Sequence, residues 1–345
     1  MKKYNVAIVG ATGMVGQSLV QVLQERNFPL GELKLLASAR SVNLTVEVLG
    51  KVYNVEEAKP EAFAGVDVAF FSAGEAISKE LAPEAVRRGA VVIDNSNAFR
   101  MDEGIPLVVP EVNAAALADH QGIIANPNCS TIQLVVALQP LQQAAALRRV
   151  VVTSYQAVSG AGKEAVDELL KQSKAIIEGE TDFPKERIPH ANAKVQYQLA
   201  FNVVPQIDVF GEDGYCKEER KVIQETRKIM GLPELKITAT TVRVPVLNGH
   251  SEAVNLEFVS RLSVAEARAA LEGAPGVIVL DDTAELSYPM PALQDGRDEV
   301  FVGRIRADDS VPHGLNMWVV ADNIRKGAAT NSIQIAEALI ARGQL

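Results

Sequence analysis

Cysteine, positive charge and long apolar runs are all scarce in this chain of 345 residues. Two cysteines, Cys129 and Cys216, cannot build a disulfide framework and fit a reducing compartment. No apolar run approaches the roughly 18 residues that a membrane span requires. Asp and Glu outnumber Lys and Arg by 43 to 34, so no basic face is expected for a nucleic acid or an anionic membrane. The first residues enter a strand pattern directly, without the pattern of a signal peptide, and we expect a cytoplasmic protein.

The composition is that of a folded protein with a sizeable core. Apolar residues make up 48% and charged residues 22%, which excludes a disordered or collagen-like chain. The length favours two domains.

The first 150 residues alternate between strand and helix patterns, which predicts βαβ units, a parallel sheet and an α/β, doubly wound, Rossmann-type fold. A helical pattern begins at Met14 and another covers 76–88. We place a nucleotide-binding domain at 1–130, completed by a C-terminal helix within 325–345. The expected buried strands are 5–10, 33–37, 66–71, 91–94 and 122–125.

The pattern changes near Arg149, after which alternating runs predict a mostly antiparallel sheet. The segment 180–215 has weak periodicity and is interpreted as an insertion. We therefore expect a second, α+β catalytic and dimerisation domain at 131–324, with the chemistry at the junction of the two domains. Its expected strands are 150–157, 235–246, 252–259, 277–280, 300–306 and 315–321, and its helices are 163–178 and 218–230.

A glycine-rich loop follows the first strand and opens a helix. Its sequence is Gly10-Ala-Thr12-Gly13-Met14-Val15-Gly16. In this context glycines let the backbone approach a pyrophosphate at the helix N-terminus. The loop predicts dinucleotide binding, and the alternative is an ordinary strand-to-helix turn.

The end of the second strand separates the two nicotinamide cofactors. An acidic residue there binds the ribose 2′-hydroxyl of NAD, whereas an arginine accommodates the 2′-phosphate of NADP. The sequence has no carboxylate at this place but has Ser38, Arg40 and Ser41. This favours NADP, against the alternative of a solvated surface arginine.

Cys129 lies in Asn-Pro-Asn128-Cys129-Ser-Thr, after a buried strand and before an apolar helix. A helix N-terminus stabilises a thiolate, which predicts a nucleophile. The alternative is a small buried hydrophobic residue, and Cys216 is assigned to that alternative because its neighbours provide no such setting.

A thiolate beside a hydride acceptor implies oxidation of an aldehyde through a thioester, which needs an acid/base near the sulfur. His250 is the candidate, interpreted as the end of a strand at a glycine turn, where its side chain can enter a cleft. His120, His190 and His313 are interpreted as solvated. We expect no metal site.

Over essentially its whole length the chain resembles the aspartate-β-semialdehyde dehydrogenase family. The resemblance rests on the joint, ordered occurrence of GATGMVG, SARS, DNSNAFR, NPNCST, YQAVSGAG, AFNVVPQID, EERK, TTVRVPVLNGHSE and DNIRKGAA. It implies NADP- and phosphate-dependent interconversion of L-aspartate 4-semialdehyde and L-4-aspartyl phosphate, a step towards lysine, threonine and methionine. It also implies a homodimer or a tetramer.

The resemblance further implies residue roles. Cys129 matches the nucleophile, His250 the acid/base and Gln156 the residue that orients the substrate. Arg243 matches the clamp on the substrate carboxylate and Glu218 the partner of its amino group. Two further sets match ligand contacts. The phosphate set is Arg100, Asn128 and Lys221; the cofactor set is Gly10, Thr12, Gly13, Met14, Val15, Gly16, Ser38, Arg40, Ser41, Ser72, Ser159, Gly160 and Asn323.

Two departures concern the cofactor. Glu75 stands where the family has a small residue, and Asn43 replaces a common glycine.

Three rival functions remain: N-acetyl-γ-glutamyl-phosphate reductase, a non-catalytic NADP-sensing protein of the same fold, and a cysteine hydrolase. The first acts on an acylated, uncharged amine, so the Glu218 match speaks against it. The second needs neither Cys129 nor His250, and the third has no use for a dinucleotide loop.

Overall fold

The computed structural model describes residues 2–48 and 50–345, and the chain divides into two compact units. Unit 1 runs to Asn128 and also contains Gly327–Leu345, while unit 2 is Cys129–Lys326. The C-terminal segment thus belongs to the same unit as the N-terminal residues.

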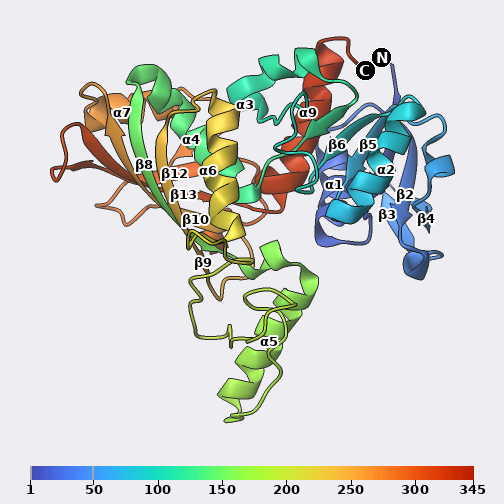
Figure 1. Ribbon diagram of the computed structural model, residues 1–345, viewed down its shortest axis with the longest axis horizontal. Coiled ribbons are helices and arrows are strands. Elements are labelled where there is room, and N and C mark those ends of the chain that lie inside the picture. Colours follow the sequence, from blue (N-terminus) through green and yellow to red (C-terminus); the bar gives the residue numbers. More distant parts are fainter. Residues whose placement is uncertain (1, 49) are drawn as a thin grey trace. The chain divides into compact units, whose positions relative to one another are not determined.

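Unit 1 contains a sheet with the strand order β3-β4-β2-β1-β5-β6-β7 (Figure 1). Neighbouring strands from β4 to β7 pair in parallel, whereas β3 pairs with β4 in an antiparallel hairpin that the sequence analysis did not predict. The strands are β1 (Tyr4–Val9), β2 (Leu30–Ala37), β3 (Thr45–Val48), β4 (Lys51–Glu57), β5 (Val68–Phe71), β6 (Val91–Asp94) and β7 (Ile123–Ala125).

Both faces of this sheet are covered, as a parallel sheet requires. Val6 and Ile8 of β1 join one core cluster with α1 (Met14–Glu25) and α9 (Thr330–Ala341), and Figure 1 shows α9 in red. Ala7 and Val9 join the other cluster, with α2 (Glu75–Arg87). The doubly wound fold predicted from the sequence is confirmed. A short helix, α3 (Pro110–Asn113), precedes β7, and short helical turns lie at 39–41, 60–63 and 114–119.

Unit 2 contains a mixed sheet with the order β11-β12-β13-β10-β8-β9, in which the three pairs between β12 and β8 are antiparallel. Three helices pack beside it, as Figure 1 shows: α4 (Cys129–Ala144), α6 (Lys217–Met230) and α7 (Val264–Glu272). The strands are β8 (Leu147–Gln156), β9 (Lys236–Arg243), β10 (His250–Phe258), β11 (Val277–Val279), β12 (Val300–Asp308) and β13 (Gly314–Ala321).

The segment 178–216 follows α5 (Lys163–Ile177) and forms neither helix nor strand among the described residues, as expected for an insertion. It packs through Ile188, Leu199 and Val204 against Leu169 of α5. A short helix, α8 (Pro291–Gln294), precedes β12. The residues expected as one C-terminal helix form a π-helical turn, Arg325–Ala329, followed by α9.

Candidate active site

The register of unit 2 aligns three of the predicted site residues. Gln156 at the end of β8 pairs with Arg243 at the end of β9. Ser251 of β10 pairs with Tyr155, so His250 lies level with Gln156. Because residues directly opposite one another on paired strands share a face, Arg243, Gln156 and His250 form one row. All three side chains are buried.

Cys129 reaches this row from α4, where it is the first helical residue. Its Sγ lies 3.2 Å from Nε2 of His250. The sequence analysis placed Cys129 correctly at a helix N-terminus, where the dipole favours a thiolate. It placed His250 wrongly: β9 ends at Arg243 and His250 begins β10, because the glycine turn at Gly249, with φ +86°, precedes the strand.

A backbone N–H fixes the tautomer of His250. The amide of Ala157 donates to Nδ1 at 3.0 Å, so the proton of a neutral ring sits on Nε2 and faces the sulfur. The pKa of His250 is lowered to about 3: burial is the main cause, the positive charge of Arg243 adds to it, and Glu218 opposes the shift. His250 is therefore a neutral imidazole at neutral pH, with an Nε2–H donor directed at Cys129.

A chain of polar contacts connects the rest of the row to α6. Gln156 accepts from the hydroxyl of Ser154 at 3.0 Å and donates from Nε2 to Glu218 at 3.1 Å. The other carboxylate oxygen of Glu218 accepts from Lys221 at 2.9 Å. Glu218 lies in the first turn of α6, where the helix dipole stabilises a carboxylate.

Arg243 is held on one side only. Its Nη1 donates to the carbonyl of Ala157 at 2.6 Å, whereas its buried Nε has no hydrogen-bond partner among the described residues. Burial lowers the pKa of Arg243, with the charges of Glu218 and Cys129 opposing the shift. A buried donor without a partner is costly, so this side of the guanidinium is suited to an anionic ligand.

Gly160 leaves space beside the row. A Cβ atom on Gly160 would lie 3.2 Å from Nη1 of Arg243 and 3.3 Å from Nε2 of His250. Ser159 and Asn323 also lie together, since Nδ2 of Asn323 donates to Oγ of Ser159 at 3.0 Å. Oδ1 of Asn323 accepts from the N–H of Gly249 at 2.8 Å, next to His250.

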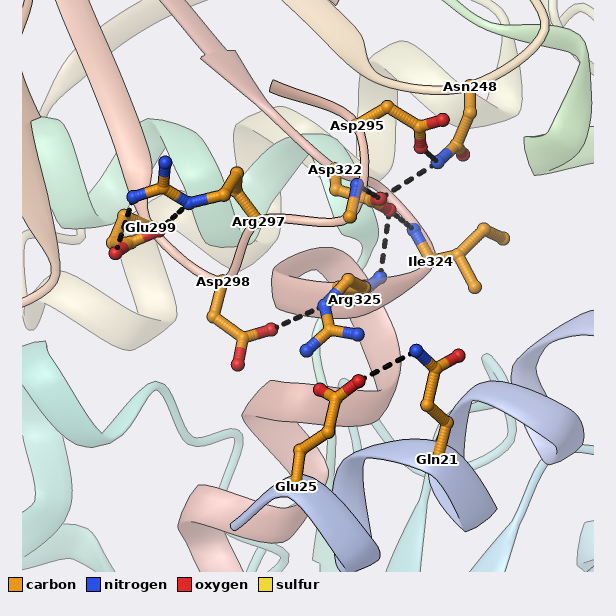
Figure 2. Close-up of polar contacts among 11 residues, drawn as sticks. Gln21, Glu25, Asn248, Asp295, Arg297, Asp298, Glu299, Asp322, Ile324 and Arg325 are labelled. Carbon is orange, nitrogen blue, oxygen red and sulfur yellow. Dashed lines mark hydrogen bonds and ion pairs between the residues drawn. The ribbon is translucent and has the colours of Figure 1, made fainter. Parts of the chain in front are cut away.

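The loop before His250 is anchored by acidic residues (Figure 2). Nδ2 of Asn248 donates to Asp322 at 2.8 Å and to Asp295 at 2.5 Å. Asp322 also accepts from the N–H groups of Gly296, Ile324 and Arg325. Burial and the nearby Asp295 raise the pKa of Asp322, while these N–H groups oppose the shift.

In unit 1, two glycines of the loop are required by space. A Cβ on Gly16 would lie 2.2 Å from the carbonyl oxygen of Gly10, and one on Gly10 would lie 2.7 Å from that of Ser72. Gly10 and Ser72 follow β1 and β5, where the strand order reverses and doubly wound folds bind ligands. Gly13 caps α1, whose first turn has neither an acidic residue nor a side-chain cap. The loop of Gly10, Thr12, Gly13, Met14, Val15 and Gly16 therefore fits a pyrophosphate.

The other predicted cofactor residues of unit 1 flank these strand ends. Ser38 and Arg40 are exposed just after β2. Arg40 lies within the short helical turn 39–41, which ends at Ser41. Glu75 begins α2 and forms an ion pair with Lys79 at 2.7 Å, which gives its charge a partner. Asn43 has φ +76°, in the left-handed region that glycine favours and asparagine tolerates, so asparagine is compatible with the backbone conformation at this position.

The predicted phosphate residues Arg100 and Asn128 are buried in unit 1, whereas Lys221 lies in unit 2. The guanidinium of Arg100 donates to the backbone carbonyls of Asn126 and Asn95, at 3.0 and 2.8 Å. It is thereby attached to the loop that leads to Asn128.

The position of Cys216 differs from the one inferred from the sequence, which gave it no place at a helix N-terminus. It is the N-cap of α6, so it does lie at a helix start, but it is fully buried and its Sγ contacts the hydroxyl of Thr241 at 3.3 Å. A helix N-terminus therefore does not distinguish the two cysteines; the neighbouring imidazole does. His313 is exposed, while His120 and His190 are partly buried.

Sequence reasoning missed three residues that lie in or beside the row. Ala157 acts through its backbone, which leaves no sequence signal. Gln133 and Glu252 are buried near the row, and each is a polar residue at an apolar position of its helix or strand pattern. That pattern was the available signal.

A membrane-spanning helix and a cluster of metal-binding side chains are both absent from the residues that the structure describes. No helix among them is long and apolar enough to span a membrane. Within the same residues, no group of three or more His, Cys, Asp or Glu could hold a metal ion.

A dinucleotide-type fold in unit 1 and a cysteine–histidine pair in unit 2 define a class of NAD(P)-dependent aldehyde dehydrogenases that act through a covalent thioester. Residues 5–120 match the family described as semialdehyde dehydrogenase, NAD binding domain. Residues 138–326 match semialdehyde dehydrogenase, dimerisation domain. The chain belongs to the semialdehyde dehydrogenase family, and within it to the aspartate-semialdehyde dehydrogenases.

Curated relatives and solved structures support this placement. The chain is 55% identical to the aspartate-semialdehyde dehydrogenase of Aquifex aeolicus, over 99% of both chains. It is 54% identical to that of Bacillus subtilis, over 97% of both. A crystal structure of aspartate semialdehyde dehydrogenase II complexed with ASA, from Vibrio cholerae, shares 45% identity with a TM-score of 0.94, over 99% of both chains. A Candida albicans enzyme solved with NADP shares 27% identity with a TM-score of 0.77, over 100% of both. The resemblance inferred from the sequence is confirmed.

Proposed function

We propose that the protein catalyses the NADP-dependent interconversion of L-aspartate 4-semialdehyde and L-4-aspartyl phosphate, with inorganic phosphate as co-substrate, in the biosynthesis of lysine, threonine and methionine. The single observation that supports it most is the contact between Cys129 and His250. Arg243 and Glu218 are also buried, and both are close enough to act electrostatically on His250. The relatives' names support the substrate.

The first step follows from the contact between Sγ and Nε2. The thiolate of Cys129 attacks the aldehyde carbon, a carbon–sulfur bond forms, and the carbonyl oxygen becomes an alkoxide. The Nε2–H of His250 donates to this alkoxide, as it donated to the sulfur before. The acid/base role predicted for His250 is therefore assigned to Nε2, which shares its proton with the substrate oxygen. Nδ1 cannot take this role, because it accepts the N–H of Ala157.

NADP, when bound, supplies the hydride acceptor, and loss of hydride from the adduct leaves a thioester on Cys129. Phosphate then attacks the thioester carbon, the carbon–sulfur bond breaks, and the Cys129 thiolate is restored. One proton is released from phosphate to solvent. Lys221, Arg100 and Asn128 are the proposed phosphate contacts, because an oxyanion with high charge requires cationic and amide donors.

Substrate recognition is assigned to opposite charges. The guanidinium of Arg243, with its Nε still available, binds the α-carboxylate. Glu218 accepts from the ammonium group, and Gln156, which already contacts Glu218, orients the chain between them. An acylated amine carries no charge for Glu218, and this disfavours N-acetyl-γ-glutamyl-phosphate reductase.

The cofactor role is assigned to the glycine-rich loop of unit 1 together with Ser38, Arg40, Ser41 and Ser72. Ser159, Gly160 and Asn323 of unit 2 complete the proposed contacts. We accordingly take residues up to about 130 and the C-terminal helix as the NADP-binding domain, and 131–324 as the catalytic and dimerisation domain.

The assembly and location belong to the same proposal. The match to a dimerisation domain supports a homodimer, and a tetramer of two such dimers is the larger assembly to test. Light scattering over a range of concentrations distinguishes them. A cytoplasmic location agrees with the absence of a membrane-spanning helix among the described residues.

The test is a spectrophotometric assay. Purified protein is mixed with L-aspartate 4-semialdehyde and NADP, with and without phosphate, and NADPH is measured. Sustained NADPH formation that requires phosphate supports the proposal. No signal with either NADP or NAD contradicts it and favours a non-catalytic binding protein, for which NADP affinity would then be measured directly.

A further inference from the structure

A buried carboxyl group lies directly behind the row of Arg243, Gln156 and His250. Glu252 is two residues along β10 from His250, so the two side chains lie on the same face of the sheet. Its side chain has 0% exposure. Glu252 pairs with Ser154 of β8, and Ser154 in turn pairs with Thr241 of β9. These three residues form a second row.

The two hydroxyls of the second row have partners, but the carboxyl does not. Ser154 donates to Gln156, and Thr241 contacts Cys216. Neither oxygen of Glu252 has a hydrogen-bond partner that meets normal geometry among the described residues. An ionised carboxylate buried in this way is strongly unfavourable, so the group is expected to be neutral.

Gln133 is the neighbouring polar residue of α4. It follows Cys129 by four residues, so both lie on the same face of the helix. Its side chain is 1% exposed, and Nε2 donates to the backbone carbonyl of His250 at 3.4 Å. Its Oε1 is buried without a partner among the described residues. Gln133 therefore connects the nucleophile's helix to the strand that carries the imidazole.

The unsatisfied groups of the two residues are complementary. A neutral carboxylic acid has one O–H donor, and an amide oxygen accepts it. Burial raises the pKa of Glu252 well above its ordinary value, and the Gln133 amide, which interacts with the carboxyl, opposes that shift. When the O–H donates to Oε1, the amide cannot turn over, and its Nε2 stays directed at His250.

We propose that Glu252 and Gln133 form a buried positioning pair, in which the carboxylic acid fixes the Gln133 amide and the amide holds the first turn of α4 against the start of β10. This keeps Sγ of Cys129 at Nε2 of His250. The inference rests on the proposed function, since it concerns the same cysteine–histidine site. Neither residue touches the reacting atoms.

Four variants test the pair by turnover. Glu252→Gln keeps a donor and should retain kcat within about twofold, whereas Glu252→Leu and Gln133→Leu should each lower kcat by about tenfold or more with little change in KM. The double variant should be no worse than either single one, because the residues act as a unit. Thr226→Val is the matched control, since Thr226 is also buried with an unpartnered hydroxyl among the described residues, and it should leave kcat unchanged.

The reactivity of Cys129 provides a readout that needs no substrate. Iodoacetamide alkylation is followed against pH in a Cys216→Ala background. Glu252→Gln should reproduce the parent profile, while Glu252→Leu and Gln133→Leu should slow alkylation and move its midpoint upward, because the imidazole N–H no longer faces the sulfur. Failure of turnover in the parent with a normal alkylation profile would count against the proposed function and not against the pair.

Unfolding measurements test the charge state. If folded Glu252 is neutral, the folded protein retains a proton that the unfolded chain loses above pH 4.5, so stability falls as pH rises from that value. Glu252→Gln removes this titration and should gain stability over the parent from about pH 4.5 upward. Cys129, Glu218, Arg243 and His250 titrate in both proteins, so the difference isolates Glu252.

The outcomes divide cleanly. A Glu252→Gln protein that loses as much kcat as Glu252→Leu, or is less stable than the parent at pH 8, shows an ionised and paired carboxylate and overturns the proposal. Wild-type kcat in Gln133→Leu, or additive losses in the double variant, overturns it too. If Glu252→Leu fails to fold, the results for Glu252→Gln and Gln133→Leu still decide whether the positioning pair exists.

Discussion

Ala157 fixes the proton of His250: its backbone N–H donates to Nδ1 at 3.0 Å, and the ring is left with Nε2–H against Cys129. The carbonyl of the same residue accepts from Arg243. The backbone of one residue, directly after β8, thus orients both the imidazole and the guanidinium, so the site is preorganised by backbone groups that lose no side-chain entropy.

The nucleophile is tested by exchanging the two cysteines for alanine. Cys129→Ala should abolish turnover and leave NADP affinity within a few-fold, because the glycine-rich loop lies in the other unit. Cys216→Ala should keep turnover, since its buried sulfur contacts the hydroxyl of Thr241 and not the imidazole of His250. Initial rates and NADP titration measure both. Activity in Cys129→Ala, with loss in Cys216→Ala, would reverse the assignment.

Arg243 is tested through substrate discrimination. Arg243→Leu should lower kcat/KM by about tenfold or more, because a charge-assisted hydrogen-bonded pair is worth about 1.5 to 3 kcal/mol. Arg243→Lys should recover only part of the loss, since an ammonium group cannot provide the planar fork of donors. An unchanged kcat/KM in Arg243→Leu would remove this residue from the site.

Gly160 is tested by adding one methyl group. Gly160→Ala would place a Cβ 3.3 Å from Nε2 of His250 and 3.2 Å from Nη1 of Arg243, so one of these side chains must shift. Because catalysis depends on close positioning, we expect kcat to fall by about tenfold or more while the protein stays folded. Gly273→Ala is the matched control, because Gly273 also has an ordinary φ and a Cβ there would meet its nearest neighbour at 3.6 Å, an ordinary contact distance. Equal activity in both variants would show that the site has room to spare.

The preference for NADP is assigned to Arg40, and two substitutions test the assignment. Arg40→Ala should weaken NADP binding far more than NAD binding, because only NADP carries a 2′-phosphate. Glu75→Ser tests the remaining charge: we expect NAD use to be unchanged and NADP binding to tighten only if the ion pair with Lys79 leaves the carboxylate near the phosphate. Calorimetric titration with each cofactor provides the comparison. An equal loss for both cofactors in Arg40→Ala would contradict the clamp.

The depressed pKa of His250 predicts an acid-dependent loss of stability. The folded protein keeps His250 neutral down to about pH 3, whereas the unfolded chain binds a proton below its ordinary 6.5. Stability should therefore fall as pH decreases through this window, by up to about 1.4 kcal/mol per pH unit. His250→Asn should reduce that slope in urea unfolding measured from pH 7 to 4. An unchanged slope would show that the pKa of His250 is the same in the folded and unfolded protein.

The motifs predicted the parts of the site whose chemistry lies in a residue type at a strand end. The glycine-rich loop, Arg40 and Cys129 follow the ends of parallel strands, where the fold class alone directs side chains to one edge. The row of Arg243, Gln156 and His250 could not be predicted in the same way. It depends on the register of β8 with β9 and β10, which are separated by long stretches of sequence.

Other features depend on contacts that a single sequence does not encode locally. The β3–β4 hairpin was missed although its residues alternate between polar and apolar types, which is a strand pattern; β3 has only four residues, so the pattern is short. His250 was assigned to the wrong end of a strand, since a glycine turn marks a boundary but not its direction. The tautomer set by Ala157 depends on a backbone group, and every residue type but proline offers the same N–H.

The covalent step is tested most directly by rapid mixing of enzyme, NADP and L-aspartate 4-semialdehyde without phosphate. We predict a burst of NADPH close to one per active site, followed by slow hydrolysis of the thioester on Cys129, with phosphate or arsenate restoring turnover. His250→Asn should slow the burst itself, whereas Lys221→Ala should spare the burst more than the steady state. A rapid steady state that ignores phosphate and shows no burst would contradict a thioester resolved by phosphate.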